Sequence, residues 1–225
     1  MKRSIGEWAL RIAILLLGLT IAHLGVTLFL LSDLGSDPFN VLVQGLFRTL
    51  ERLTGWNFLS HGRVHIAVSL LIILLLLLTD RRYVKIGTVL CMVCGGPIID
   101  FFTVRLAFLP ERLSTLPLRI LMLALGCVIL AFGMTIVIRS DAGTGPNDLV
   151  AVVLSDKLGK KFSLVRVAVD AAFLALGWLL GGIVGLGTLI CMLLVGPVAG
   201  VFLPLNGRWI DALVQRLCGT NDEFT

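Results

Sequence analysis

Two short polar segments hold most of the side chains in this sequence that could bind or move a solute. Each has the pattern Ser-Asp-x-Gly-x-x-Pro, at residues 32–38 and 140–146, and each follows a long apolar stretch. Carboxylates and hydroxyls at breaks in membrane helices are groups that transporters use to bind substrates and coupling ions. The candidate binding residues in and just after these segments are Ser32, Asp33, Asp37, Asn40, Ser140, Asp141, Asn147 and Asp148.

The same segments also have a structural interpretation as hinges. Proline fits the first turn of a helix, and Asp37 before Pro38 is a favoured N-cap. Asp33 and Asp141 recur at the same place in both segments, so we keep a binding role for them beside that of solvated loop residues. The candidate hinge residues, including two Gly-Pro steps where a helix can unwind, are Gly35, Pro38, Gly143, Gly145, Pro146, Gly96, Pro97, Gly196 and Pro197.

Three further polar residues stand inside apolar stretches. His23 could relay a proton, although packing with a satisfied hydrogen bond is the commoner role of such a histidine. Asp100 follows a Gly-Pro step and is either a functional group or an interface residue near Arg105. Asp170 lies one helical turn after Arg166, and this spacing predicts an ion pair.

Other motifs with chemical meaning are absent or wrongly placed. Cys91-x-x-Cys94 lies within an apolar stretch, where packing is the expected role, and His61-x-x-x-His65 has no third metal ligand nearby in the sequence. No Gly-x-Ser-x-Gly motif or phosphate-binding P-loop is present. We therefore expect no enzymatic activity, no metal site and no cofactor.

The composition predicts the elements that carry these residues. Hydrophobic residues make up 57% of the chain and charged residues 15%, so a water-soluble fold is excluded. The net charge of +5 lies in loops, which indicates membrane topology rather than nucleic-acid binding. An all-α, polytopic helical membrane bundle in contact with the lipid bilayer is predicted, with apolar stretches at 8–31, 64–79, 86–104, 120–138, 164–180 and 188–205.

An internal repeat organises these stretches. Residues 11–42 align with 119–150 without a gap and share 12 of 32 residues, and residues 84–97 share 7 of 14 with 184–197. We interpret residues 1–225 as a single membrane domain made of two copies, 8–109 and 117–205. Residues 206–218 have one apolar stripe and are expected to form an amphipathic interfacial helix on the cytoplasmic side.

The two short helices predicted at 38–52 and 146–158 decide the topology. If they cross the membrane, the chain is a 4+4 parallel repeat of about eight helices; if they are re-entrant half-helices, it is a 3+3 inverted repeat. With both termini cytoplasmic, Lys and Arg divide 15 to 4 in the first arrangement and 13 to 6 in the second. We therefore expect the parallel repeat, with both hinges on the outer side and Asp33 and Asp141 sharing one site.

Glycines indicate where helices approach each other closely. Gly18 and Gly25 recur as Gly126 and Gly133, seven residues apart on one helix face. Small residues at such spacing let membrane helices pack backbone against backbone. These positions are the predicted seams of the bundle.

The paired segments Ser-Asp-Leu-Gly-Ser-Asp-Pro-Phe (32–39) and Ser-Asp-Ala-Gly-Thr-Gly-Pro-Asn (140–147), with the Gly-Thr-x-x-Cys-Met-x-x-x-Gly-Pro blocks, resemble the YczE/YitT family, chiefly its YczE branch. The resemblance covers nearly the whole chain. It implies a multi-pass protein of the bacterial cytoplasmic membrane and carries over no catalytic residue.

The leading functional hypothesis is a small secondary transporter or permease for a small solute or ion, based on the duplicated acidic hinges. The alternative is a non-transporting membrane protein that anchors or regulates a cytoplasmic partner, and a homo-oligomer is compatible with either. A basic cytoplasmic face with an amphipathic tail favours this alternative.

Overall fold

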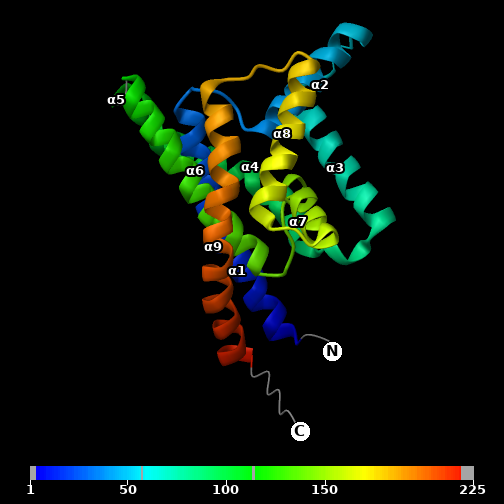
Figure 1. The fold of residues 1–225 in the computed structure, drawn as a ribbon, viewed down its shortest axis with the longest axis vertical. Coiled ribbons are helices and arrows are strands. Elements are labelled where there is room, and N and C mark those ends of the chain that lie inside the picture. Colours follow the sequence, from blue (N-terminus) through cyan, green and yellow to red (C-terminus); the bar gives the residue numbers. More distant parts are fainter. Residues whose placement is uncertain (1–3, 57, 113–114, 219–225) are drawn as a thin grey trace.

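The computed structural model describes residues 4–56, 58–112 and 115–218, and these residues form helices and connecting segments without a strand (Figure 1). The all-α prediction is confirmed. In chain order the elements are α1 (Ile5–Leu31), α2 (Pro38–Thr54), α3 (His61–Thr79), the 3₁₀ helix η1 (Arg81–Tyr83), α4 (Ile86–Leu106), α5 (Leu109–Arg112), α6 (Leu116–Arg139), α7 (Pro146–Leu158), α8 (Phe162–Leu179) and α9 (Leu186–Cys218).

Six of the described helices are long and apolar enough to cross a membrane: α1, α3, α4, α6, α8 and α9. The two helices that follow the hinges, α2 with 17 residues and α7 with 13, fall short of this. The expectation of about eight membrane helices is therefore wrong for the described chain. A hydrocarbon core requires about 20 residues of helix, and both hinge helices also carry charges.

The centre of the bundle is an antiparallel pair formed by α1 and α6, which run in opposite directions in Figure 1. A Cβ atom placed on Gly25 would lie 2.3 Å from the backbone nitrogen of Leu130, and one on Gly133 would lie 2.2 Å from that of Ala22. The two backbones are thus in direct contact at the predicted glycine seams, and a longer side chain has no room there.

The antiparallel pair places the two hinges at opposite ends of the molecule. The hinge after α1 lies beside the start of α6, where Arg119 Nη1 is 3.8 Å from Asp33 Oδ2. The hinge after α6 lies beside the start of α1, where Arg11 Nη1 donates to the carbonyl oxygen of Ser140 at 3.0 Å. The expectation of two like-oriented hinges on one face is therefore wrong. The sequence pattern of an apolar helix does not reveal in which direction the helix crosses the membrane. The numbers of Lys and Arg on the cytoplasmic side, 15 and 13 in the two arrangements, differ too little to decide between them.

The outer helices extend this arrangement. α4 runs parallel to α1, because Gly87 contacts Leu15 and Gly95 contacts His23. α9 runs parallel to α6, since Gly187 near its start contacts Leu123 and Gly207 further along contacts Arg139. Both helices continue through their Gly-Pro steps at 96–97 and 196–197, so the expected unwinding does not occur there. The face on which α1 begins and α9 ends is called the terminal face below.

The segment 206–218 is the end of α9 and not a separate helix, which corrects the expected interfacial helix. Its Ile210 is 0% exposed and Val214 5% exposed, and both pack in one cluster with Ile14 of α1 and Ile136 of α6. The Ile210 and Val214 side of the apolar stripe therefore faces the core of the bundle, whereas Trp209 and Leu217 are exposed.

Candidate functional site

The two hinges have the same backbone geometry. Asp33 and Asp141 adopt left-handed conformations with φ of 54° and 55°, and Gly35 and Gly143 follow with φ of 138° and 135°. Asp tolerates this region better than most residues, whereas the glycine values are accessible to glycine alone. In each hinge the preceding serine, Ser32 or Ser140, is fully buried and donates its hydroxyl to a backbone carbonyl of its own helix. The serines therefore close the ends of α1 and α6 and do not face a solute.

Each hinge rests on the start of an outer helix from the other half of the chain. The Gly187 N–H donates to the Leu34 carbonyl at 2.8 Å, and the Gly87 N–H donates to the Ala142 carbonyl at 2.9 Å. A Cβ atom on Gly143 would lie 2.5 Å from the backbone nitrogen of Thr88. Glycine is thus required here for close backbone approach as well as for its positive φ.

The hinge carboxylates do not form a shared site. α6 has 24 residues, which separates the two hinges by roughly 35 Å at about 1.5 Å per residue. The Asp33 side chain is 89% exposed, and Asp141 is paired with Lys85. The prediction that Asp33 and Asp141 face one cavity is therefore wrong, because it depended on the parallel arrangement of the copies.

The hinge helices begin where the prolines predicted, at Pro38 and Pro146. Asp37 caps α2 by accepting from the Asn40 backbone N–H at 3.1 Å, and it also accepts from the Asn40 side-chain amide. Gly145 occupies the same position before α7 and supplies no side-chain cap. The cap role of Asp37 is thus confirmed, and Asn147 lies beside Gly145 in the uncapped first turn of α7.

A buried charged cluster is the main polar feature inside the described bundle. Arg166 Nε donates to Asp170 Oδ2 at 2.9 Å, which confirms the predicted ion pair. Arg166 Nη1 also donates to Asp148 Oδ1 at 2.5 Å. The exposed side-chain fractions are 10% for Arg166, 2% for Asp170 and 19% for Asp148. One guanidinium therefore bridges two carboxylates, one on α8 and one on the first turn of α7.

The sequence patterns point to each of these three residues but not to their connection. The hinge pattern indicates Asp148, and the spacing of one helical turn indicates the Arg166–Asp170 pair, but Asp148 and Arg166 are 18 positions apart. A signal did exist: the residue at the position of Asp148 in the first copy is Asn40, and Arg63 matches Arg166, so only the second copy has both charges. Charged groups at the same helix depth in a membrane protein are expected to pair.

The start of α2 approaches α8 from the other end of the molecule. The ring of Phe39 lies 5.4 Å from that of Phe173, and it contacts the His65 ring at 5.3 Å. Phe173 is seven residues beyond Arg166 on α8, or about 10 Å. From the other hinge helix, Asp148 on the first turn of α7 binds Arg166 of the same α8. The first turns of both hinge helices thus converge on the middle of α8, where Asp170 is located.

The remaining predicted polar residues lie outside this cluster. His23 Nδ1 is 2.7 Å from the Leu19 carbonyl oxygen, a hydrogen bond of the kind expected for a histidine with a packing role. Asp100 is exposed on the outer face of α4. His61 Nε2 lies 3.4 Å from Asn40 Oδ1, and all five cysteines are free. Of the predicted candidates, the fold therefore brings Asp37, Asn40, Asp148 and Asp170 toward the same region.

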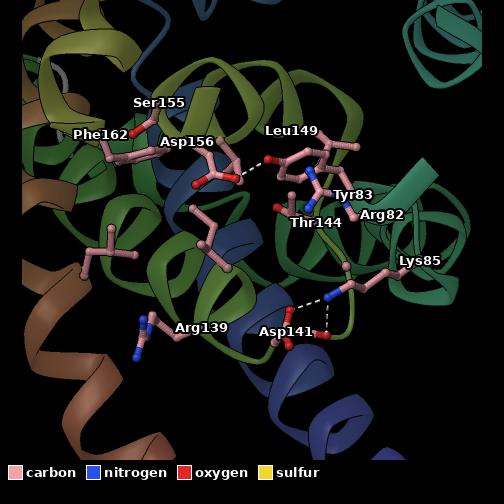
Figure 2. Close-up of a pocket in the computed structure, with 14 residues that line it drawn as sticks. Arg82, Tyr83, Lys85, Arg139, Asp141, Thr144, Leu149, Ser155, Asp156 and Phe162 are labelled. Atoms are coloured by element: carbon pink, nitrogen blue, oxygen red, sulfur yellow. Dashed lines mark hydrogen bonds and ion pairs between the residues drawn. The ribbon is translucent and has the colours of Figure 1, made fainter. Parts of the chain in front are cut away.

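A cavity of about 560 Å³ opens near the terminal face between hinge 140–145, η1 and α7 (Figure 2). Its wall includes Asp141, which pairs with Lys85, and Thr144, whose buried hydroxyl has no hydrogen-bond partner. The Tyr83 hydroxyl donates to Asp156, and this bond raises the tyrosine pKa. The cavity thus combines charged groups of both signs with an apolar floor, as solute sites commonly do.

The chain is similar to three bacterial proteins that are described as uncharacterized, one of them as a membrane protein. It is 29% identical over 211 residues to the uncharacterized membrane protein YczE of Bacillus subtilis (strain 168), covering 93% of each chain. It is 29% identical over 198 residues to an uncharacterized protein of Haemophilus influenzae (88% of this chain, 85% of that protein), and 27% identical over 194 residues to YyaS of Bacillus subtilis (85% and 92%). No solved structure matches.

The resemblance to the YczE branch is confirmed by the first of these relatives, whose name calls it a membrane protein. The six described helices that are long and apolar enough to cross a membrane agree with that character. A family model matches residues 9–204, which is most of the chain. The chain therefore belongs to the family of unknown function DUF6198.

Proposed function

We propose that this protein is a small secondary transporter of the bacterial cytoplasmic membrane that moves a small solute or ion. The observation that carries the proposal is the convergence of two hinge helices, from opposite ends of the bundle, on the buried Arg166–Asp148–Asp170 cluster. Discontinuous helices that meet near the bilayer midplane form the binding sites of many transporters, and buried ionisable groups there serve ion or proton coupling.

The proposed architecture is a 3+3 inverted repeat in which α2 and α7 are re-entrant. The reciprocal hydrogen bonds from Gly187 to Leu34 and from Gly87 to Ala142 support it, because aligned positions in the two copies make the same contact with exchanged partners. The paired φ values of the hinges support it as well. An inverted repeat allows one copy to be open to one side while the other is closed.

The orientation follows from charge. The terminal face carries most of the basic side chains, among them Arg81, Arg82, Lys85, Arg139, Lys157, Lys160 and Lys161, so we assign it to the cytoplasm. In a cysteine-less background, Asp33→Cys is expected to react with a membrane-impermeant maleimide from outside intact cells, and Asp141→Cys only after the cells are opened. Labelling of both positions from the same side would rule out the inverted repeat.

Transport itself is tested with purified protein in proteoliposomes, using a panel of cations, amines and organic acids. We expect wild-type protein to move at least one of them, and Asp170→Asn to move none while eluting as a folded protein in detergent. Asp33→Asn is the matched control, because this exposed carboxylate lies outside the cluster, and its flux should equal wild type. A panel without flux, together with a cytoplasmic protein that co-purifies in stoichiometric amount, would favour the anchoring role.

The anchoring role has lost part of its support. It drew on a basic cytoplasmic face and an amphipathic tail at 206–218; the basic face remains, but Ile210 and Val214 of the tail are buried against α1 and α6. We therefore retain it as an outcome of the transport test and not as an equal candidate.

A further inference from the structure

The two halves of the chain share a fold but differ in how their third and fourth helices pack. In the second half α8 lies against α9: a Cβ atom on Gly196 would be 2.7 Å from Val167 Cγ2, and one on Gly200 would be 2.8 Å from Ser163 Cβ. The aligned positions in the first half are Gly96, Val64, Asp100 and Ser60. There a Cβ atom on Gly96 would meet nothing within 4 Å, so α3 stands away from α4 at this point.

The segments before α4 and α9 also differ in how closely they pack, and again the packing is tighter in the segment before α9. On the face opposite the terminal face, α2 is sealed by the loop after α8: Gln44 Oε1 accepts from the Ile183 N–H at 2.7 Å, and Arg48 Nη1 donates to the Gly181 carbonyl at 2.9 Å. A Cβ atom on Gly182 would lie 2.4 Å from the Val41 carbonyl. The aligned residues on the terminal face, Val152, Asp156, Arg82, Tyr83 and Leu149, line the 560 Å³ cavity.

Equivalent positions are thus in direct backbone contact at one end, whereas at the other a cavity lies between them that, among the described residues, only the Tyr83–Asp156 side-chain hydrogen bond bridges. Because the two copies have the same fold, each can adopt the packing that the other shows, and the two resulting conformations differ little in free energy. This exchange is the basis of alternating access in inverted repeats.

We infer that α3 has a second position, packed against the Gly96–Asp100 face of α4 as α8 packs against α9, and that reaching it closes the cavity on the terminal face. The inference rests on the proposed transport function for its purpose. In this account the structure is the state open to the terminal face, and the side chains of Arg82 and Tyr83 fill the cavity when α3 and η1 move inward. Solutes would enter from that side through the cavity.

Cross-linking tests the second position without knowledge of the solute. In native membrane vesicles and a cysteine-less background, the pair Ser60→Cys and Asp100→Cys is expected to form an intramolecular disulfide under mild oxidation. A third cysteine at Ser155, which lines the cavity, reports closure by its reaction with a polar maleimide. We expect its labelling rate to fall about tenfold once the 60–100 disulfide has formed, since the reactive state is then nearly unpopulated.

The pair Ser163→Cys and Gly200→Cys is the matched control, since these aligned positions already touch and should cross-link in the same background. A second test uses Gly96→Leu, which should leave thermal stability intact yet block the 60–100 disulfide by filling the docking face. If the control pair forms and the 60–100 pair does not, α3 is fixed and the inference is overturned. Disulfide-linked dimers would overturn it too, because that face would then join two chains.

The outcomes also separate this inference from the proposed function. Closure of the cavity without flux of any tested solute would leave the movement standing and count against transport. Undiminished flux in protein locked by the 60–100 disulfide would support transport and refute the gating role of α3. Unchanged labelling at Ser155 in the locked protein would likewise refute the link between α3 and the cavity.

Discussion

Replacing Arg166 by leucine is expected to destabilise the protein by about 3–5 kcal/mol, the typical cost of removing one partner of a buried ion pair. The guanidinium is bound by two carboxylates of low exposure, Asp148 and Asp170. Without it both carboxylates remain buried and face each other without compensation. The measurement is the free energy of unfolding in detergent, or the midpoint of thermal unfolding followed by size-exclusion chromatography.

Single amide replacements should cost less than the loss of Arg166. Asp148→Asn leaves the Arg166–Asp170 pair intact, and Asp170→Asn leaves the pair with Asp148, so one cation still faces one anion in each case. Arg166→Lys keeps the charge but loses the two-pronged geometry, and its effect should be intermediate. If Arg166→Leu is no less stable than Asp148→Asn, the bridge does not contribute in the way the contacts indicate.

A combined variant separates stability from transport. With both carboxylates changed to asparagine, Arg166→Leu should regain part of its lost stability, because no buried charge is then left without a partner. Flux should stay absent, since the ionisable groups proposed to bind or couple are gone. Recovery of both stability and flux would show that the cluster has only a structural role.

The second large effect is expected at the glycine seam between α1 and α6. Gly133→Leu places a side chain where a Cβ atom alone would lie 2.2 Å from the Ala22 backbone nitrogen and 2.6 Å from the Gly18 carbonyl oxygen. Backbone atoms cannot give way as a flexible side chain can. We expect a loss at or above the upper end of the usual overpacking range of about 1–3 kcal/mol, measured as thermal stability in detergent, with a similar loss for Gly25→Leu.

Gly96→Leu is the control for this effect. It lies mid-helix on α4, as Gly133 does on α6, but a Cβ atom there would meet nothing within 4 Å. Its stability should stay close to wild type, because the better helix propensity of leucine, about 1 kcal/mol over glycine, is offset by its contact with the ring of the following Pro97. Equal losses at Gly96 and Gly133 would show that the glycines matter for backbone conformation and not for helix contact.

Local features of the fold could be predicted from the sequence because they depend on neighbours in the chain. The helices after the hinges begin at Pro38 and Pro146, Asp37 caps the first of them, and Arg166 pairs with Asp170 one turn away. The glycine seams were also predictable, since spacing on a helix face follows from helix geometry. The partner of each seam was not, because spacing alone does not say which helix approaches.

By itself, the sequence determined that this is a helical membrane protein with two acidic, proline-ended hinges, because hydrophobic length and the conformational limits of proline and glycine act locally. Only the tertiary structure decided the direction of each helix, since an apolar stretch packs equally well either way and the bias from loop charges was small. These directions separate Asp33 from Asp141, bring Asp148 to Arg166, and pack Ile210 and Val214 of the last segment against α1 and α6. The candidate site therefore arises from packing between distant segments, which no local pattern specifies.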